Sequence, residues 1–311
     1  MKFTATHIDA HGVTHVHSIT ITLARFIKHF VLAGAGFTPS AILLTRGIGA
    51  LAWYWDFVEP VASGQDYFGE PVPVLRDPTL KAHFSNLTGR AFADFMGRHI
   101  ANSWVTLSYE GVLEQNRLPI VGPRPDLLAV NPLSVVALEA KGYSKKSVSN
   151  AEMAVHKHQA SQGRLNRHAW AASVTYGLYD KVKVKYLDPE DDAPAPSLKT
   201  TRRYLERYFL EIERAAGQLG GSTRIIDGRR LEALPLTEFV RGQFPLDVDR
   251  SGVLNKVMLL IDRNVAAIAS ERLDRLSIIQ EQGREAAEQL PLTDSDTMFI
   301  DCDGIGISID G

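Results

Sequence analysis

PDLLAVNPLSVVALEAK, residues 125–141, is the stretch from which the fold can be predicted. It contains two short apolar runs, Leu127–Val130 and Val135–Leu138. Both runs are too hydrophobic for half-exposed strands, so we expect both to be buried in a sheet. The dipeptide Asn131-Pro132 between them is a turn signal. The stretch therefore predicts two neighbouring, antiparallel, buried strands.

The register of these strands predicts a site. A loop of residues 131–134 would place Asp126 opposite Glu139 and Arg124 opposite Lys141. Opposite side chains of an antiparallel pair share a face with their Cβ atoms about 5 Å apart, and Lys141 shares the face of Glu139 because the two are two residues apart on one strand. Two carboxylates this close repel each other, and the compensation we expect is a divalent cation. Oxygen ligands of this kind suit Mg²⁺ or Mn²⁺ rather than zinc.

These residues resemble a known signature. Pro125-Asp126, twelve further residues and then Glu139-Ala140-Lys141 are similar to the motif of the PD-(D/E)XK nuclease superfamily, which has the restriction-endonuclease-like fold. The resemblance implies that Asp126, Glu139 and the Ala140 carbonyl bind Mg²⁺, with Mn²⁺ as a substitute. It implies that Lys141 positions or deprotonates the attacking water. The alternative interpretation is a surface salt-bridged hairpin with a chance Glu-x-Lys.

Two further site candidates come from the same resemblance. Gln159 matches the position at which the exonuclease-like branch carries Gln or Lys on the next helix, but Gly163 stands where a Tyr often follows. Gln159 as a solvated helix residue therefore stays open. Asp94 lies where some members carry an additional acid, although a solvent-facing helix acid is the favoured interpretation. A metal site formed by the N-terminal histidines is not favoured, because only Asp9 lies near His7, His11, His15 and His17.

Composition and charge fit a folded protein without a global signature of nucleic-acid binding. The 311 residues are 45% hydrophobic and 23% charged, with a net charge of −2, as is usual for a soluble domain. Between Lys141 and Tyr186, however, nine Lys or Arg face only Glu152 and Asp180, a local excess of +7. Such a strip can contact phosphates, although a solvated face has the same composition.

Targeting and redox signals are weak. Cys302 is the single cysteine, which excludes an intrachain disulfide and fits a reducing, cytoplasmic setting. The first twelve residues lack the apolar segment of a signal peptide. The most apolar region, residues 30–55, is interrupted by Pro39 and Arg46, so we expect buried helices there rather than a membrane span.

The pattern along the chain predicts an α/β protein with a restriction-endonuclease-like core, in which a mixed central sheet is flanked by helices. We expect an accessory region over 1–80, the core over 81–188 and a mainly helical region over 198–311. The expected helices are within 23–58 and at 80–103, 149–166, 200–219 and 254–276. The expected strands are 14–22, 104–112, 170–176, 181–187 as an edge strand, and a hairpin over 298–309; linkers are expected at 64–78 and 188–197.

Three functions compete at this point. The first is a Mg²⁺-dependent phosphodiesterase, an endo- or exonuclease; the resemblance favours DNA over RNA and suggests host defence or DNA repair. The alternative is a catalytically silent nucleic-acid-binding or scaffold protein with the same fold. The third is an unrelated globular protein with a chance motif. Nucleic acid is the expected partner, a membrane is not, and cleavage of both strands would favour a homodimer. Lys181, Lys183 and Lys185 would then contact phosphates or protect a sheet edge.

Overall fold

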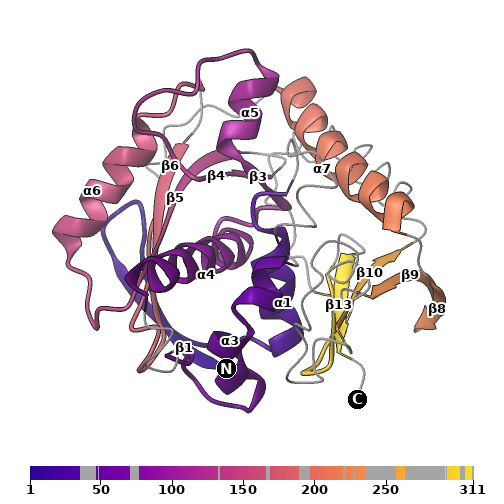
Figure 1. Ribbon diagram of the computed structural model, residues 1–311. Helices are drawn as coiled ribbons and strands as arrows, with labels where there is room; N and C mark the ends of the chain where they lie inside the picture. The colour runs from indigo at the N-terminus through magenta and orange to yellow at the C-terminus, as the bar shows by residue number, and fades with distance from the viewer. Residues whose placement is uncertain are drawn as a thin grey trace.

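Two sheets form the frame of the molecule (Figure 1). The computed structural model describes residues 1–35, 47, 49–70, 77–131, 134–165, 169–188, 197–219, 222–226, 228–235, 257–262, 291, 293–301 and 305–309. Within these ranges the chain has a mixed seven-stranded sheet and an antiparallel six-stranded sheet. The predicted mixed sheet flanked by helices is confirmed.

The seven-stranded sheet carries the predicted core strands. Its order is β2 (Thr14–Thr20), β1 (Lys2–Ile8), β7 (Lys183–Leu187), β6 (Ala169–Tyr176), β5 (Val135–Tyr143), β4 (Leu127–Val130) and β3 (Val105–Ser108). The pairs β1–β7 and β5–β6 are parallel and the other pairs are antiparallel. The register of β4 and β5 is the predicted one, since Leu127 pairs with Leu138 and Val130 with Val135. Asp126 and Glu139 are the next pair along this register.

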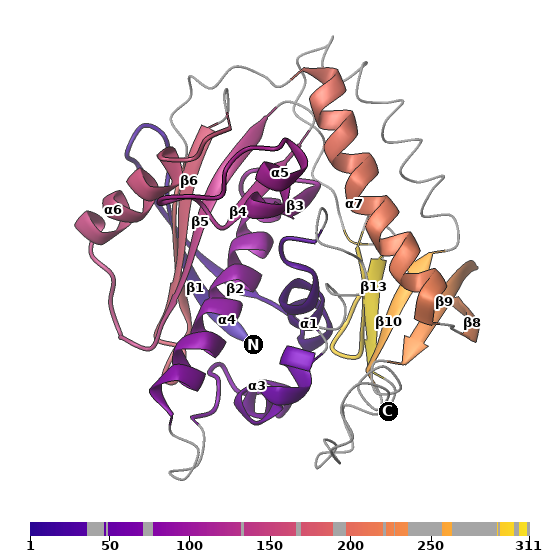
Figure 2. The ribbon, with the colours of Figure 1, turned by 45° about the horizontal axis from the view of Figure 1, so that its top comes forward.

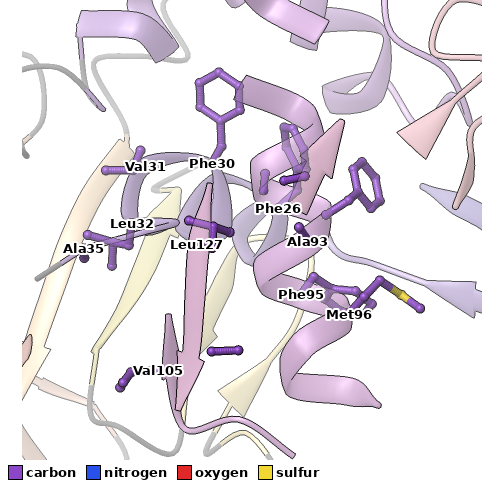
Figure 3. Close-up of a cluster of buried hydrophobic side chains, with 14 of the residues drawn as sticks. Phe26, Phe30, Val31, Leu32, Ala35, Ala93, Phe95, Met96, Val105 and Leu127 are labelled. Atoms are coloured by element: carbon purple, nitrogen blue, oxygen red, sulfur yellow. The ribbon is translucent and has the colours of Figure 1, made fainter. Parts of the chain in front are cut away.

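Helices cover both faces of the seven-stranded sheet (Figures 1 and 2). Helix α6 (Asn150–Ser161) lies on one face and begins with a capping box between Ser149 and Glu152. Helices α4 (Pro78–His99), α1 (Leu23–Leu32) and α3 (Trp55–Ala62) lie on the other. Their apolar faces pack together: Phe26 and Phe30 of α1 gather with Phe95 and Met96 of α4 and with Leu127 of β4 (Figure 3).

Helix α4 touches β5 more closely than side chains normally permit. A Cβ on Gly89 of α4 would collide with the backbone of Lys141 and Gly142, and a Cβ on Gly142 would collide with the carbonyl of Ser85. Glycine at both positions therefore lets the helix backbone rest on the strand. This contact fixes α4 beside the segment of β5 that carries Glu139 and Lys141.

The six-stranded sheet corrects the expectation of a mainly helical C-terminal region. Its order is β11 (Thr293–Asp294), β12 (Met298–Ile300), β13 (Ile305–Ile309), β10 (Val257–Asp262), β9 (Arg229–Pro235) and β8 (Ser222–Ile226). Strand β10 occupies part of the helix predicted over 254–276; its run VMLLID is buried at every position, and such a run does not distinguish a buried strand from a buried helix. Residues 263–276 lie outside the described residues. The hairpin of β12 and β13 and the helix α7 (Leu198–Leu219) are as predicted.

Two core elements also differ from the prediction. Residues 109–112, expected to extend the strand from 104, begin helix α5 (Tyr109–Gln115), because the Ser108 hydroxyl accepts a hydrogen bond from Gly111 N at 3.3 Å and caps the helix. Strand β7 is not an edge strand, since β1 pairs with it in parallel. Its lysines therefore do not protect a sheet edge.

The N-terminal region belongs to the same sheet as the core. The hairpin of β1 and β2 turns at His11-Gly12, with Gly12 at φ +78°, and β1 then adds to β7. The expected boundary near residue 80 is therefore not a boundary of the sheet. Helix α1 lies between α4 and the second sheet, and α7 contacts β3 and β4 as well as β9. No helix among the described residues is long and apolar enough to cross a membrane.

Candidate metal centre and adjoining cleft

The three residues of the predicted motif converge at one point. Asp126 immediately precedes β4, and Glu139 and Lys141 lie on β5. Lys141 Nζ lies 3.4 Å from Asp126 Oδ2 and forms an ion pair with Glu139 Oε1. The backbone N–H of Ala140 donates a hydrogen bond of 3.1 Å to Asp126 Oδ2. We call Asp126, Glu139 and Lys141 the charged triad.

Glu139 is the unusual member of the charged triad. The residue is fully buried, whereas the side chains of Asp126 and Lys141 are 34% and 25% exposed. Its Oε2 has no hydrogen-bond partner among the described residues. Burial, followed by repulsion from Asp126, raises the pKa of Glu139 to about 8. Below about pH 8 a proton neutralises the buried group, and in its ionised form the carboxylate calls for a further positive group.

Lys141 remains a cation. Burial alone would lower its pKa, but the carboxylates of Asp126 and Glu139 outweigh that effect, so the pKa of Lys141 is raised. An ammonium that holds its proton this firmly does not act as a base. Of the two roles implied for Lys141, positioning is therefore the one that the electrostatics of the triad favour.

The charged triad fits a hard divalent cation in its donor chemistry. Among the described residues, no three His, Cys, Asp or Glu side chains gather closely enough to hold a metal ion by themselves. Mg²⁺, however, is commonly bound through only one or two carboxylates, with water and substrate oxygens as its other ligands. The free Oε2 of Glu139 and the neighbouring carboxylate of Asp126 are such a pair. The Ala140 carbonyl as a third ligand stays a prediction.

A cleft adjoins Asp126. It has a volume of about 410 Å³ and is lined by residues of α4, α5, α6 and the loop before β4, namely Arg90, Ser108, Glu110, Gly122, Pro123, Arg124, Pro125, Asp126 and Gln159. Gln159 Nε2 donates a hydrogen bond of 3.3 Å to the Arg124 carbonyl, so this predicted residue lies at the cleft. The Arg124 guanidinium is paired with Glu110 instead of facing Lys141.

Sequence reasoning missed a pair of residues next to the charged triad. The Tyr143 hydroxyl and His156 Nε2 are 3.0 Å apart, and His156 Nδ1 is buried without a hydrogen-bond partner among the described residues. Burial and then the charge of Lys141 lower the pKa of His156. Two spacings could have revealed the pair: Tyr143 follows Lys141 by two strand residues, and His156 precedes Gln159 by three helix residues.

Asp94 belongs to a different cluster, and its expected exposure is wrong. It is 1% exposed, and its carboxylate contacts His29 Nδ1 at 2.6 Å, Thr106 Oγ1 at 2.8 Å and Arg98 Nε at 3.4 Å. Asp301, at the end of β12, contacts Arg98 Nη1 at 2.8 Å and Lys28 Nζ at 2.5 Å. We call Lys28, His29, Asp94, Arg98 and Asp301 the buried ion network. It joins α1, α4 and the second sheet, so Asp94 has a structural role.

The N-terminal histidines are likewise paired away from the charged triad. His7 Nε2 lies 2.8 Å from Asp188 Oδ2, and His15 Nε2 lies 2.9 Å from Asp9 Oδ2. His7 and His15 therefore each contact a carboxylate of their own.

The basic strip is partly neutralised by its own neighbours. Lys145 is paired with Glu152, and Lys146 with Asp180 at 2.9 Å. Lys185 Nζ donates to Asn150 Oδ1 at 2.5 Å and to the Val148 carbonyl at 3.3 Å, which ties β7 to the start of α6. The two acids already subtracted in the local excess of +7 are thus both paired within the strip.

Comparison with known proteins finds no family model, no curated protein and no solved structure that matches this chain. Its function is therefore argued from the geometry and chemistry of the site.

Proposed function

We propose that the protein is a Mg²⁺-dependent nuclease with a restriction-endonuclease-like core, similar to the PD-(D/E)XK superfamily. The observation that carries the proposal is the fully buried Glu139 carboxylate, whose Oε2 lacks a hydrogen-bond partner among the described residues while Asp126 and Lys141 lie beside it. A purely structural ion pair would bury Glu139 with its oxygens satisfied. DNA is the preferred substrate of the proposal, and a role in host defence or DNA repair is part of it.

The reaction is phosphodiester hydrolysis. A water oxygen bonds to phosphorus, the bond from phosphorus to the leaving sugar oxygen breaks, and that oxygen gains a proton. A bound divalent cation would supply charge relief at the phosphoryl oxygens and a more acidic water. Asp126 and Glu139 would hold it, and their mutual repulsion in its absence would become attraction to a shared ion.

Lys141 has a separate task in this mechanism. Its ammonium contacts both carboxylates and stays protonated, so it can orient the attacking water and stabilise negative charge that develops on the phosphoryl group. Gln159, held at the cleft by the Arg124 carbonyl, is placed to orient the substrate strand. We assign it a positioning role.

Single substitutions in the charged triad test the proposal. Asp126→Ala and Glu139→Ala should each abolish cleavage of a mixed DNA and RNA panel and weaken Mn²⁺ binding in calorimetric titration. Lys141→Ala should reduce cleavage by about a thousandfold or more but leave Mn²⁺ binding largely intact, because its charge acts on water and the transition state. The losses should not add in double variants, since the residues work as one unit.

Two results would contradict the proposal. Full activity in folded Lys141→Ala would exclude the mechanism, and normal Mn²⁺ binding in both carboxylate variants would place the metal elsewhere. Binding of nucleic acid by the native chain without metal-dependent cleavage would favour the alternative, a catalytically silent nucleic-acid-binding or scaffold protein. If the chain neither binds nor cleaves nucleic acid, the third interpretation, an unrelated globular protein with a chance motif, would be favoured.

A further inference from the structure

Arg90 lines the same cleft as Asp126, although it comes from the opposite side of the sheet from α6. Its position follows from the close contact of α4 with β5, because it directly follows Gly89. That contact holds the backbone of α4 at position 89 against the strand that carries Glu139 and Lys141.

The guanidinium of Arg90 occupies a space that Gly34 leaves open. Gly34 has φ +76°, and a Cβ there would lie 2.6 Å from Arg90 Nη2. The same nitrogen donates a hydrogen bond of 3.5 Å to the Ala33 carbonyl. A side chain at position 34 would therefore displace the guanidinium, so the turn after α1 shapes this wall of the cleft.

Arg90 is partly exposed, and it differs from Lys28, Arg98 and Arg124 in lacking a counter-charge. Among the described residues no carboxylate forms an ion pair with it, and its Nε is buried without a hydrogen-bond partner. Lys28 and Arg98, by contrast, are paired with Asp301, and Arg124 is paired with Glu110. Because Arg90 Nε is removed from water without a partner and no carboxylate among the described residues pairs with the guanidinium, an anion is the partner that we expect. A guanidinium binds phosphate through two parallel hydrogen bonds, which makes phosphate the natural choice.

We propose that Arg90 forms a phosphate-binding subsite for the substrate strand next to the scissile phosphate. The identity of the substrate as nucleic acid rests on the proposed function. The cleft volume of about 410 Å³ is at the small end of ligand pockets, which hold roughly 300–1,000 Å³. The subsite therefore has room for about one phosphate with its sugar.

Equilibrium binding tests the subsite without cleavage. The full-length chain with Glu139→Gln, which disables the reaction in the proposed mechanism, is titrated with a labelled single-stranded DNA of about 12 nucleotides at several KCl concentrations. Adding Arg90→Met should weaken binding about tenfold and lower the slope of log K against log salt by about 0.7, the value for one phosphate contact on a single strand. Arg90→Lys should have an affinity between those of the protein with Arg90 and of the Arg90→Met variant, because lysine keeps the positive charge but cannot form the two parallel hydrogen bonds of a guanidinium.

Arg202→Met is the matched control, since it removes one exposed arginine, paired with Glu206 on α7, that does not line the cleft. It should leave affinity and salt slope nearly unchanged. Equal losses in the two variants, or unchanged binding in a folded Arg90→Met protein, would overturn the subsite. Calorimetric Mn²⁺ titration of Arg90→Met on the native Glu139 background should give native affinity; a weakened ion site would mean that Arg90 acts through the metal centre instead.

Two single-stranded DNA oligonucleotides, one with and one without a 5′-phosphate, identify which phosphate is bound. If the Arg90 effect is confined to the phosphorylated strand, the subsite takes a terminal phosphate; if both strands show it, the subsite takes an internal phosphodiester. Failure of the proposed function can be told apart from failure of the subsite. If the native chain never cleaves DNA but Arg90→Met still lowers its affinity for DNA, the phosphate subsite is supported and the proposed nuclease function is excluded.

Discussion

The charged triad and the buried ion network are both built from acids and bases inside the molecule, yet their carboxylates respond to burial in opposite ways. In the network, burial acts to raise the pKa of Asp94 and of Asp301, but the cations around them outweigh it, and both pKa values are lowered. In the triad, burial and Asp126 together raise the pKa of Glu139 to about 8, despite Lys141. The number of partners explains the difference.

Each carboxylate of the network has several partners. Asp94 has His29, Arg98 and Thr106, and Asp301 has Lys28 and Arg98. Glu139 shares the single cation Lys141 with Asp126 and keeps one oxygen without a partner among the described residues. The carboxylates of the network are thus balanced by cations within the chain, whereas Glu139 needs a proton or an added cation to balance its charge. This contrast separates a structural cluster from a candidate metal centre.

The largest effect on stability should come from breaking the network. Asp94→Ala leaves Arg98 short of a buried counter-charge, and we expect it to lower the free energy of unfolding by about 3–5 kcal/mol, the usual cost of removing one partner of a buried pair. Urea denaturation measures the change. The matched variant Asp126→Ala removes the same type of group from the triad and should cost less than about 1 kcal/mol without metal, because it relieves repulsion. Equal losses would erase the distinction between the two clusters.

A smaller effect, of opposite sign, should follow from Glu139→Gln. The pKa of Glu139 in the folded protein, about 8, lies above its ordinary value of 4.5. The stabilisation that follows from this raised pKa is therefore fully present below pH 4.5, where Glu139 is protonated in both states. It is lost as the pH rises through 8. Glu139→Gln should accordingly raise the stability of the metal-free protein by about 1–3 kcal/mol near pH 9, where the loss of a partner for Lys141 offsets part of the gain.

The same variant should have little effect on stability near pH 5, where Glu139 is already protonated. Thermal unfolding in EDTA across this pH range checks both statements. A large drop in melting temperature for Glu139→Gln would identify a structural salt bridge and count against the metal centre. At saturating Mn²⁺ the native chain should become more stable than Glu139→Gln, because the ion stabilises only the chain that binds it.

The smallest effect concerns the surface lysines, which lie outside both clusters. Neutralising Lys181, Lys183 and Lys185 together should weaken nucleic-acid binding a few-fold and flatten its salt dependence. Lys185→Ala alone should leave the salt slope unchanged and cost about 1 kcal/mol of stability, because its ammonium ties β7 to α6. An unchanged slope in the triple variant would mean that the strip does not contact phosphate.

The sequence by itself determined the strand pair that carries the charged triad. The apolar runs of β4 and β5, the turn between them and the alternation of strand faces are local properties, and together they bring Asp126, Glu139 and Lys141 to one point. The helix caps at Ser149 and the amphipathic helices are local in the same sense.

Only the tertiary structure decided which groups surround that pair. The placement of β7 inside the sheet depends on β1, about 180 residues away in the chain, and Asp301 meets Lys28 across 273 residues. The Arg90 guanidinium, which has no carboxylate partner among the described residues, reaches the cleft only once Gly34 leaves it space in the turn after α1. Contacts of this range depend on packing between elements, which no local pattern encodes. The chemistry of the site was therefore readable in the chain, while its cleft and its electrostatic surroundings were not.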